Sequence, residues 1–124
     1  MAMTILIVDD SVTMLMSLKT ALTMSGFQVE SANSGAAALE KLKSGIKPDL
    51  IVTDINMPVM GGLELIGKVR ALSGFRFTPI LTLTTESETS KRVEAKRVGA
   101  TGWLVKPLAG ADLVKVIKQV LPGA

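Results

Sequence analysis

The chain has 124 residues, 48% of them hydrophobic and 3% aromatic, which suits one domain with an aliphatic core. It has no cysteine and no histidine, so disulfides, thiol chemistry, histidine metal ligands and a phosphohistidine of its own are excluded. The net charge of +3 is modest and no segment approaches about 18 uninterrupted apolar residues, so we expect a cytoplasmic protein that binds neither nucleic acid nor membrane.

Five short apolar segments recur along the chain and predict β-strands. They cover residues 4–8, 27–32, 50–53, 79–83 and 102–105. Segments with helical spacing of apolar residues lie between them, such as Leu113, Ile117 and Leu121 at the end of the chain. This alternation predicts an α/β fold, with a five-stranded parallel sheet covered by helices on both faces. No linker or repeat interrupts it, so residues 1–124 are expected to form a single domain.

Polar side chains follow four of the five predicted strands. Asp9 and Asp10 follow the first strand, Asp54 the third, Thr84 the fourth and Lys106 the fifth. In doubly wound sheets the ligand site lies at the carboxyl ends of the strands, where the strand order reverses. With the order 2-1-3-4-5, these side chains would meet at one edge of the sheet.

Electrostatics favours a cation among the three carboxylates. Two carboxylates about 5 Å apart repel by roughly 3 kcal/mol at an effective dielectric constant of 20. Lys106 can offset one charge, but Mg²⁺ fits better, because it binds one or two carboxylates and leaves positions for water and phosphate oxygens. We therefore predict that Asp9 and Asp10 hold Mg²⁺. Asp54 is then free to attack phosphorus, with Thr84 and Lys106 contacting the phosphoryl oxygens.

Each residue also has a purely structural interpretation. Asp10 or Ser11 could be the N-cap of the helix that starts near Val12. Asp54 could begin a turn, Thr84 could be one more threonine at a strand end, and Lys106 could be an exposed loop charge. The functional interpretation depends on all these residues occurring together in the right order of strands.

These motifs resemble those of the receiver domain of two-component response regulators, over essentially the whole chain. The motifs are "VDDS", "TDINMPVMGGLEL", the threonine of "LTLTTE" and "KP". The resemblance implies the flavodoxin-like strand order 2-1-3-4-5. It also implies that Asp54 is the phosphoacceptor, and that Asp10 and Asp54 ligate Mg²⁺ directly. Asp9 would help through water, and Asn56 would contribute its backbone carbonyl.

Within this family the chain is most similar to the single-domain chemotaxis regulators, because it ends one helix after "KP" with no effector domain. The resemblance implies a cis peptide before Pro107, whose alternative is an ordinary proline at a helix start. The switch aromatic of the family falls at Trp103, where Tyr or Phe is common, and works with Thr84; the alternative is a plain core tryptophan. Asn56 and Glu86 occupy the positions that tune the lifetime of the phosphoryl group.

By this resemblance the protein is a phosphoacceptor switch and not an enzyme, apart from its own phosphorylation and dephosphorylation. The implied partners are a histidine kinase as donor, an output target such as a flagellar motor component, and possibly a phosphatase; the chain itself is expected to be a monomer. We expect the output face around residues 90–97, Trp103 and the last helix. The alternatives are a phosphorelay intermediate or phosphate sink, a small aspartyl-phosphate hydrolase, and a flavodoxin-like cofactor binder.

Overall fold

A five-stranded parallel sheet forms the centre of the molecule, with the strand order β2-β1-β3-β4-β5. The computed structural model describes residues 2–85, 89–121 and 123. The strands are β1 (Thr4–Val8), β2 (Gln28–Ala32), β3 (Leu50–Thr53), β4 (Ile80–Thr84) and β5 (Gly102–Val105). The predicted α/β class and strand order are therefore confirmed.

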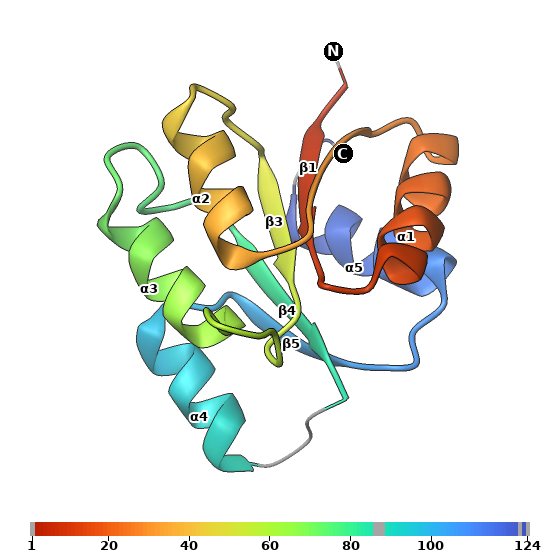
Figure 1. The fold of residues 1–124 in the computed structure, drawn as a ribbon. Helices are drawn as coiled ribbons and strands as arrows, with labels where there is room; N and C mark the ends of the chain where they lie inside the picture. Colours follow the sequence, from red (N-terminus) through yellow and green to blue (C-terminus); the bar gives the residue numbers. More distant parts are fainter. Residues whose placement is uncertain (1, 86–88, 122, 124) are drawn as a thin grey trace.

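Helices cover both faces of the sheet, as Figure 1 shows. They are α1 (Val12–Met24), α2 (Gly35–Lys43), α3 (Gly62–Ala71), α4 (Thr89–Val98) and α5 (Gly110–Val120). Helices α1 and α5 lie on one face and α2, α3 and α4 on the other. Among the residues described, no helix is long and apolar enough to cross a membrane.

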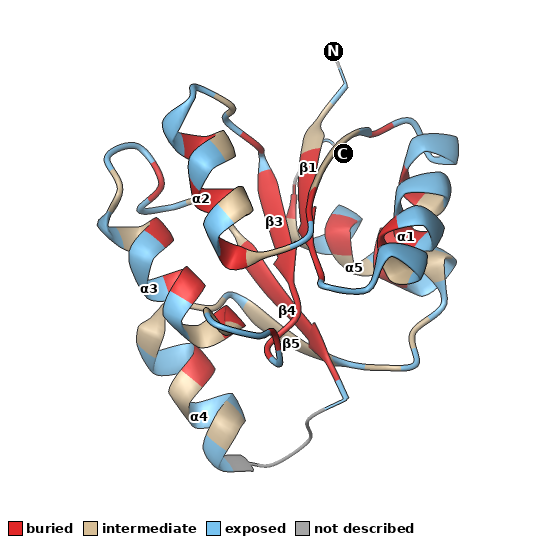
Figure 2. Ribbon diagram, in the orientation of Figure 1, coloured by how far each residue is buried: buried red, intermediate tan, exposed pale blue. Residues whose placement is uncertain are grey.

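Two apolar layers, one on each face, follow from the alternation of side chains along the strands. In β1, Ile5 and Ile7 belong to the layer under α1 and α5, whereas Leu6 and Val8 belong to the layer under α2 and α3. The central strands appear almost entirely buried in Figure 2. This explains why their sequences are continuous apolar runs without a polar face.

Two predicted strands begin one residue too early. Phe27 is buried, but its N–H donates to Leu22 O at the end of α1, so the ladder starts at Gln28. Pro79 has no N–H to donate, and β4 begins at the next residue. At its other end β4 extends through Thr84, whose carbonyl accepts a hydrogen bond from Lys106 N at 2.7 Å.

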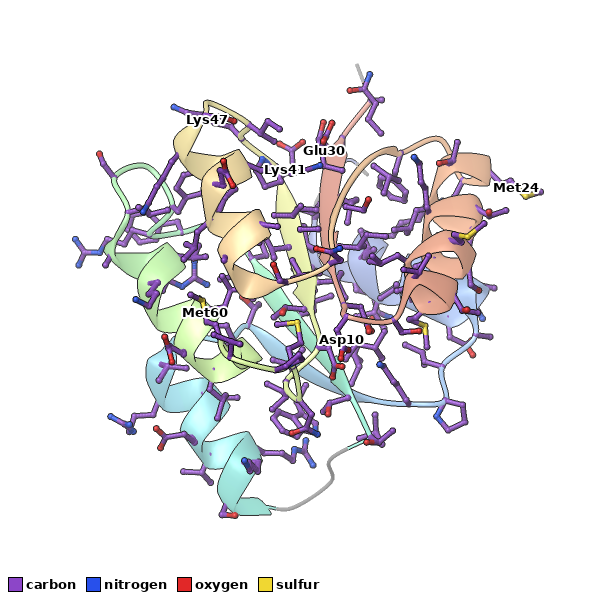
Figure 3. The ribbon with its side chains drawn as sticks, in the orientation of Figure 1. Asp10, Met24, Glu30, Lys41, Lys47 and Met60 are labelled. Atoms are coloured by element: carbon purple, nitrogen blue, oxygen red, sulfur yellow. The ribbon has the colours of Figure 1, made fainter. Side chains whose placement is uncertain are left out.

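The register of the sheet brings the ends of the strands together. Val8 of β1 pairs with Thr53 of β3, so the residues that follow these two strands are neighbours. Thr84 of β4 pairs with Val105 of β5 in the same way. In Figure 3, Asp10 lies at this carboxyl edge, while the ion pair between Glu30 and Lys41 lies toward the opposite edge.

Candidate functional site

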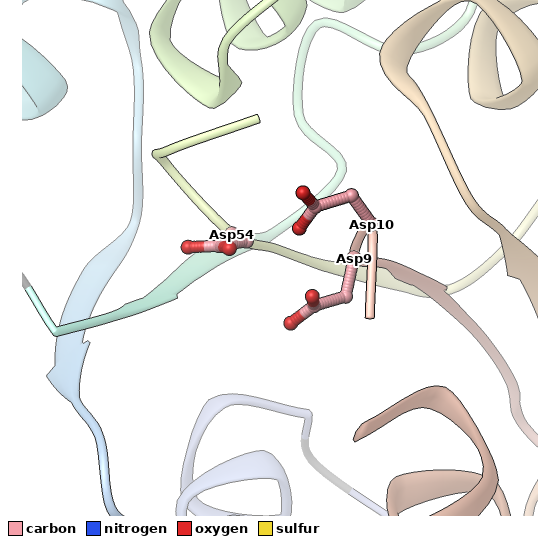
Figure 4. A group of neighbouring side chains, drawn as sticks. All are labelled: Asp9, Asp10 and Asp54. Atoms are coloured by element: carbon pink, nitrogen blue, oxygen red, sulfur yellow. The ribbon is translucent and has the colours of Figure 1, made fainter. Parts of the chain in front are cut away.

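Three carboxylates meet at the carboxyl edge of the sheet. Asp9 and Asp10 follow β1, and Asp54 follows β3 (Figure 4). One carboxylate oxygen from each lies within 4.8 Å of the others. Asp9 and Asp54 are buried, whereas Asp10 is exposed. The predicted convergence of these side chains is confirmed.

Ser11 and not Asp10 is the N-cap of α1. The Ser11 side chain accepts a hydrogen bond from Met14 N at 3.2 Å. The Ser11 backbone N–H in turn donates to Asp9 Oδ1 at 2.9 Å, which orients that carboxylate. Of the two capping residues considered, Ser11 is therefore confirmed, and Asp10 is not the N-cap.

Lys106 bridges the two buried carboxylates. Its Nζ lies 2.9 Å from Asp9 Oδ2 and 3.5 Å from Asp54 Oδ2. Burial works to lower the pKa of Lys106, but the hydrogen bond to Asp9 and the charges of Asp54 and Asp9 outweigh it and raise the pKa. Lys106 is thus a charged member of the site and not an exposed loop residue. The predicted cis peptide between Lys106 and Pro107 is present.

The environment of Asp54 disfavours its charged form. Burial raises the pKa of this carboxyl group, and the charge of Asp9 raises it further. The charge of Lys106 and the backbone N–H groups of Ile55 and Asn56 act in the opposite direction without cancelling the increase. The N–H of Ile55 donates to Asp54 Oδ1 at 2.7 Å. An added cation would remove this penalty, because it would favour the ionised form.

Thr84 lies fully buried at the end of β4, on the far side of the site from β1. Asn56 Nδ2 donates to Thr84 Oγ1 at 3.4 Å, so the loop after Asp54 reaches across to this strand. Asn56 itself is exposed. These contacts bring together Asp54, Asn56, Thr84 and Lys106, as the sequence predicts. Glu86 lies outside the described residues.

Trp103 stands apart from this cluster, in the middle of β5. It lines a hollow of about 420 Å³ together with residues of α4. Its Nε1 is buried, and it has no hydrogen-bond partner among the described residues. A tryptophan in a protein core usually donates a hydrogen bond from its indole N–H. Its role as a switch stays a prediction.

Gly62 is a residue of the site that the sequence pattern did not single out. A Cβ atom at this position would lie 2.1 Å from the backbone oxygen of Asp54, so only glycine fits. The Gly62 N–H donates to Ile55 O at 2.9 Å, which ties the start of α3 to the loop after β3. The adjacent glycines at 61 and 62 were the only signal of this close approach in the sequence.

The residues present fit a hard divalent cation. All the side-chain donors are carboxylate oxygens, the ligand type that Mg²⁺ prefers, and only one ammonium group balances the three acidic groups. Asp9 and Asp54, with carboxylate oxygens within 4.8 Å of each other, repel when both are ionised by about 3.5 kcal/mol or more at an effective dielectric constant of 20. The protein is therefore an α/β domain with a doubly wound sheet and a cluster of three carboxylates at the carboxyl edge of that sheet.

The model of the response regulator receiver domain matches residues 5–118, and the chain therefore belongs to this family. Chemotaxis protein CheY1 of Helicobacter pylori is 38% identical over 120 residues, which are 96% of this chain and 97% of that protein. Transcriptional regulatory protein PrrA of Mycobacterium tuberculosis is 39% identical over 117 residues, which are 94% of this chain. The chain spans 49% of the length of PrrA.

The fold agrees with solved structures of the family. Chemotaxis protein CheY4 of Vibrio cholerae superposes with a TM-score of 0.94 and 44% sequence identity, covering 98% of this chain and 100% of that one. A CheY-like receiver domain protein from Methanospirillum hungatei gives a TM-score of 0.90 at 30% identity, covering 97% of this chain and 94% of that chain. The resemblance noted in the sequence is confirmed.

Proposed function

We propose that this receiver domain is a phosphoacceptor switch, in which Asp54 takes a phosphoryl group from the phosphohistidine of a partner kinase. The observation that carries this proposal is the bridge from Lys106 Nζ to Asp9 and Asp54, at 2.9 and 3.5 Å. It places a fixed positive charge beside a buried carboxylate, at a site whose remaining groups are acidic. This arrangement suits a negatively charged group transferred onto Asp54.

Asp9, Asp10, Asp54 and the backbone carbonyl of Asn56 would hold Mg²⁺, which when bound neutralises charge on the transferred group. In the transfer, a carboxylate oxygen of Asp54 forms a bond to phosphorus as the P–N bond of the donor breaks. The departing imidazole keeps the electron pair of that bond and is neutralised by a proton. The chain has no histidine, so the donor is another protein or a small phosphodonor.

The new group changes the hydrogen bonds around it. Lys106 and the Thr84 hydroxyl can each donate to a phosphoryl oxygen. Two or three such bonds are worth roughly 1.5 to 3 kcal/mol each. Changing a population from 1:99 to 99:1 needs about 5.5 kcal/mol. These contacts come close to that value and could bias the end of β4 and the helix that follows it.

The output face lies over α4, Trp103 and α5. The hollow between α4 and β5 is lined by Arg92, Val93 and Lys96 on one side and by Trp103 on the other. This combination of basic and apolar groups suits a target segment with acidic and apolar side chains. Because similar proteins are named chemotaxis proteins, we propose a chemotaxis target such as a flagellar motor component. The proposal also assigns Asn56 and Glu86 a role in the lifetime of the phosphoryl group. It includes a monomer in the cytoplasm that catalyses only its own phosphorylation and dephosphorylation.

The test is the mass of the intact protein after incubation with Mg²⁺ and acetyl phosphate. The wild-type chain should gain one phosphoryl group, and Asp54→Asn should gain none. Asp49→Asn, a matched change beside the amino end of β3, should behave as wild type. No gain in the wild type, or an equal gain in Asp54→Asn, would overturn the proposal. A pull-down that captures histidine phosphotransfer domains and no motor component would favour the phosphorelay alternative.

A further inference from the structure

Val59 holds an unfavourable backbone conformation in the loop between β3 and α3. Its φ angle is 67°, and it is the only non-glycine residue with a positive φ in the described part of the chain. The N–H of Met60 donates to the carbonyl of Pro58 at 2.8 Å, which closes a three-residue γ-turn around Val59. This turn is strained at its centre, and a β-branched side chain is among the least suited to it. Glycine would adopt it freely.

The surrounding structure keeps this turn in place. Met57 is buried before it, and Met60 after it packs closely against Gly35, where a Cβ atom would come within 2.7 Å of the methionine sulfur. The Gly62 N–H closes the loop onto Ile55 O. The turn therefore cannot relax without disturbing packing on both sides.

The side chain of Val59 does not contribute to the packing of the fold. Its relative exposure is 106%, so it is as open to solvent as an isolated residue. A strained backbone combined with a side chain that lacks packing contacts points to a role outside the free molecule. The turn presents this apolar side chain rigidly, so a partner that covers it loses little conformational entropy.

The course of the loop that carries Val59 indicates which kind of partner could reach this side chain. The loop runs along the carboxyl edge of the sheet, because Asn56 contacts Thr84 and Met60 contacts Gly35 at the start of α2. A protein donor must bring its phosphorus to about 3 to 3.5 Å from a carboxylate oxygen of Asp54, so its surface must cover the rim of this site.

We propose that Val59 is a docking contact for the phosphohistidine-bearing domain of the donor kinase, against an apolar patch beside the phosphohistidine. This inference rests on the proposed function, because the donor kinase is one of the partners that this function requires. Removing two methyl groups from a buried contact weakens binding by about tenfold. A small phosphodonor makes no such contact and should not be affected.

The experiment compares two donors for each variant of the full chain. The donors are acetyl phosphate and the isolated, histidine-phosphorylated phosphotransfer domain of the kinase that transfers fastest to the wild type. For Val59→Ala and Val59→Gly, we expect kcat/KM with the protein donor to fall about tenfold, mostly through KM. Rates with acetyl phosphate should stay within about twofold of wild type, and Val59→Ile should restore transfer from the protein donor.

Two controls separate docking from folding. Met24→Ala removes another strongly exposed apolar side chain, at the end of α1 away from the carboxyl edge of the sheet, and should leave transfer from the phosphotransfer domain unchanged. Val59→Gly should raise the midpoint of urea unfolding, because it relieves the strained turn.

Equal losses with both donors, or no loss with either, would overturn the inference. If the wild type accepts phosphate from neither donor, the proposed function itself fails, and this result is distinct from the other two.

Discussion

Helices α4 and α5 both pack beside β5, yet they are attached to the molecule in different ways. Helix α5 buries Leu113, Val114 and Ile117 against the sheet and α1. In α4, Ala95 is the only fully buried side chain among those described (Figure 2). A fully buried Leu or Ile contributes about 1.5 to 3 kcal/mol, whereas an alanine methyl contributes less than 1 kcal/mol. Apolar burial therefore fixes α5 firmly and α4 weakly.

The end of α4 is held instead by a polar contact. Arg70 of α3 donates from Nε and Nη2 to the carbonyl of Gly99, at 3.2 and 2.7 Å, just after α4 ends. Elements that move in signalling are drawn from the weakly held parts of a structure. Helix α4 is the next element after Thr84 in the chain, so the strand end at the site leads into a weakly attached helix. From this comparison we expect α4, and not α5, to shift if Asp54 is modified.

Truncation of one side chain on each helix should give the largest difference. Ile117→Ala should lower the free energy of unfolding by about 2 to 5 kcal/mol, because it opens a cavity in a fully buried layer. Val93→Ala on the exposed side of α4 should change it by less than about 0.5 kcal/mol. Urea denaturation of both variants measures the two values. Similar losses would show that α4 is held as firmly as α5.

Removal of the polar contact should give a smaller effect, concentrated in α4. Arg70→Met leaves the Gly99 carbonyl and those of Phe75 and Thr78 without this donor, and we expect a loss of about 1 to 3 kcal/mol. Amide hydrogen exchange should accelerate more in α4 than in α5. Arg76→Met is the matched control, since Arg76 is exposed and lies 5.6 Å from the centre of the Phe77 ring. Equal acceleration in both helices would contradict the polar attachment.

A change of charge at Asp54 should act through electrostatics and therefore depend on pH. Because burial raises the pKa of Asp54 in the folded state, its contribution to stability is present at low pH and is lost as the pH rises through that raised pKa. Asp54→Asn should thus stabilise the protein at pH 7, with a gain that shrinks as the pH falls toward the ordinary carboxyl range. The loss from Ile117→Ala should stay constant over the same range. A pH-independent gain in Asp54→Asn would be evidence against this cause.

Trp103 should give the smallest change in stability. Trp103→Phe removes a buried N–H that lacks a partner among the described residues, but it also removes apolar surface next to α4, so we expect a net change below about 1 kcal/mol. In the wild type, beryllium fluoride with Mg²⁺ should alter the fluorescence of this single tryptophan, because the indole lies between β5 and α4. An unchanged spectrum would argue against a switch role for Trp103.

The sequence predicted the fold well, because each strand carries its own signal. The central strands are continuous apolar runs, and a polar residue marks where most of them end. The carboxyl edge followed from the same pattern, since parallel strands bring their ends together once their order is known. The strand order itself came from the resemblance to receiver domains, because no residue pattern states which strands are neighbours.

Two features could not be predicted, because they depend on contacts between distant segments. The helical spacing of Leu63, Ile66, Val69 and Leu72 predicts the apolar face of α3. The structure confirms Ile66 and Val69, and Leu72 packs against the same layer, but it also buries Leu65, which this spacing leaves out. The strained turn at Val59 was also missed, since valine is a poor residue for a positive φ and local propensity argues against it. Packing of Met57 and Met60 decides that conformation.

The close approach of Gly62 to Asp54 also limits the space on the α3 side of the site. The backbone of α3 touches the carbonyl of Asp54 with no room for a single methyl group, so this side of the site acts as a rigid wall. If Asp54 is modified as proposed, we expect the resulting displacement to run the opposite way, toward β4 and α4, where Ala95 is the only fully buried side chain among those described.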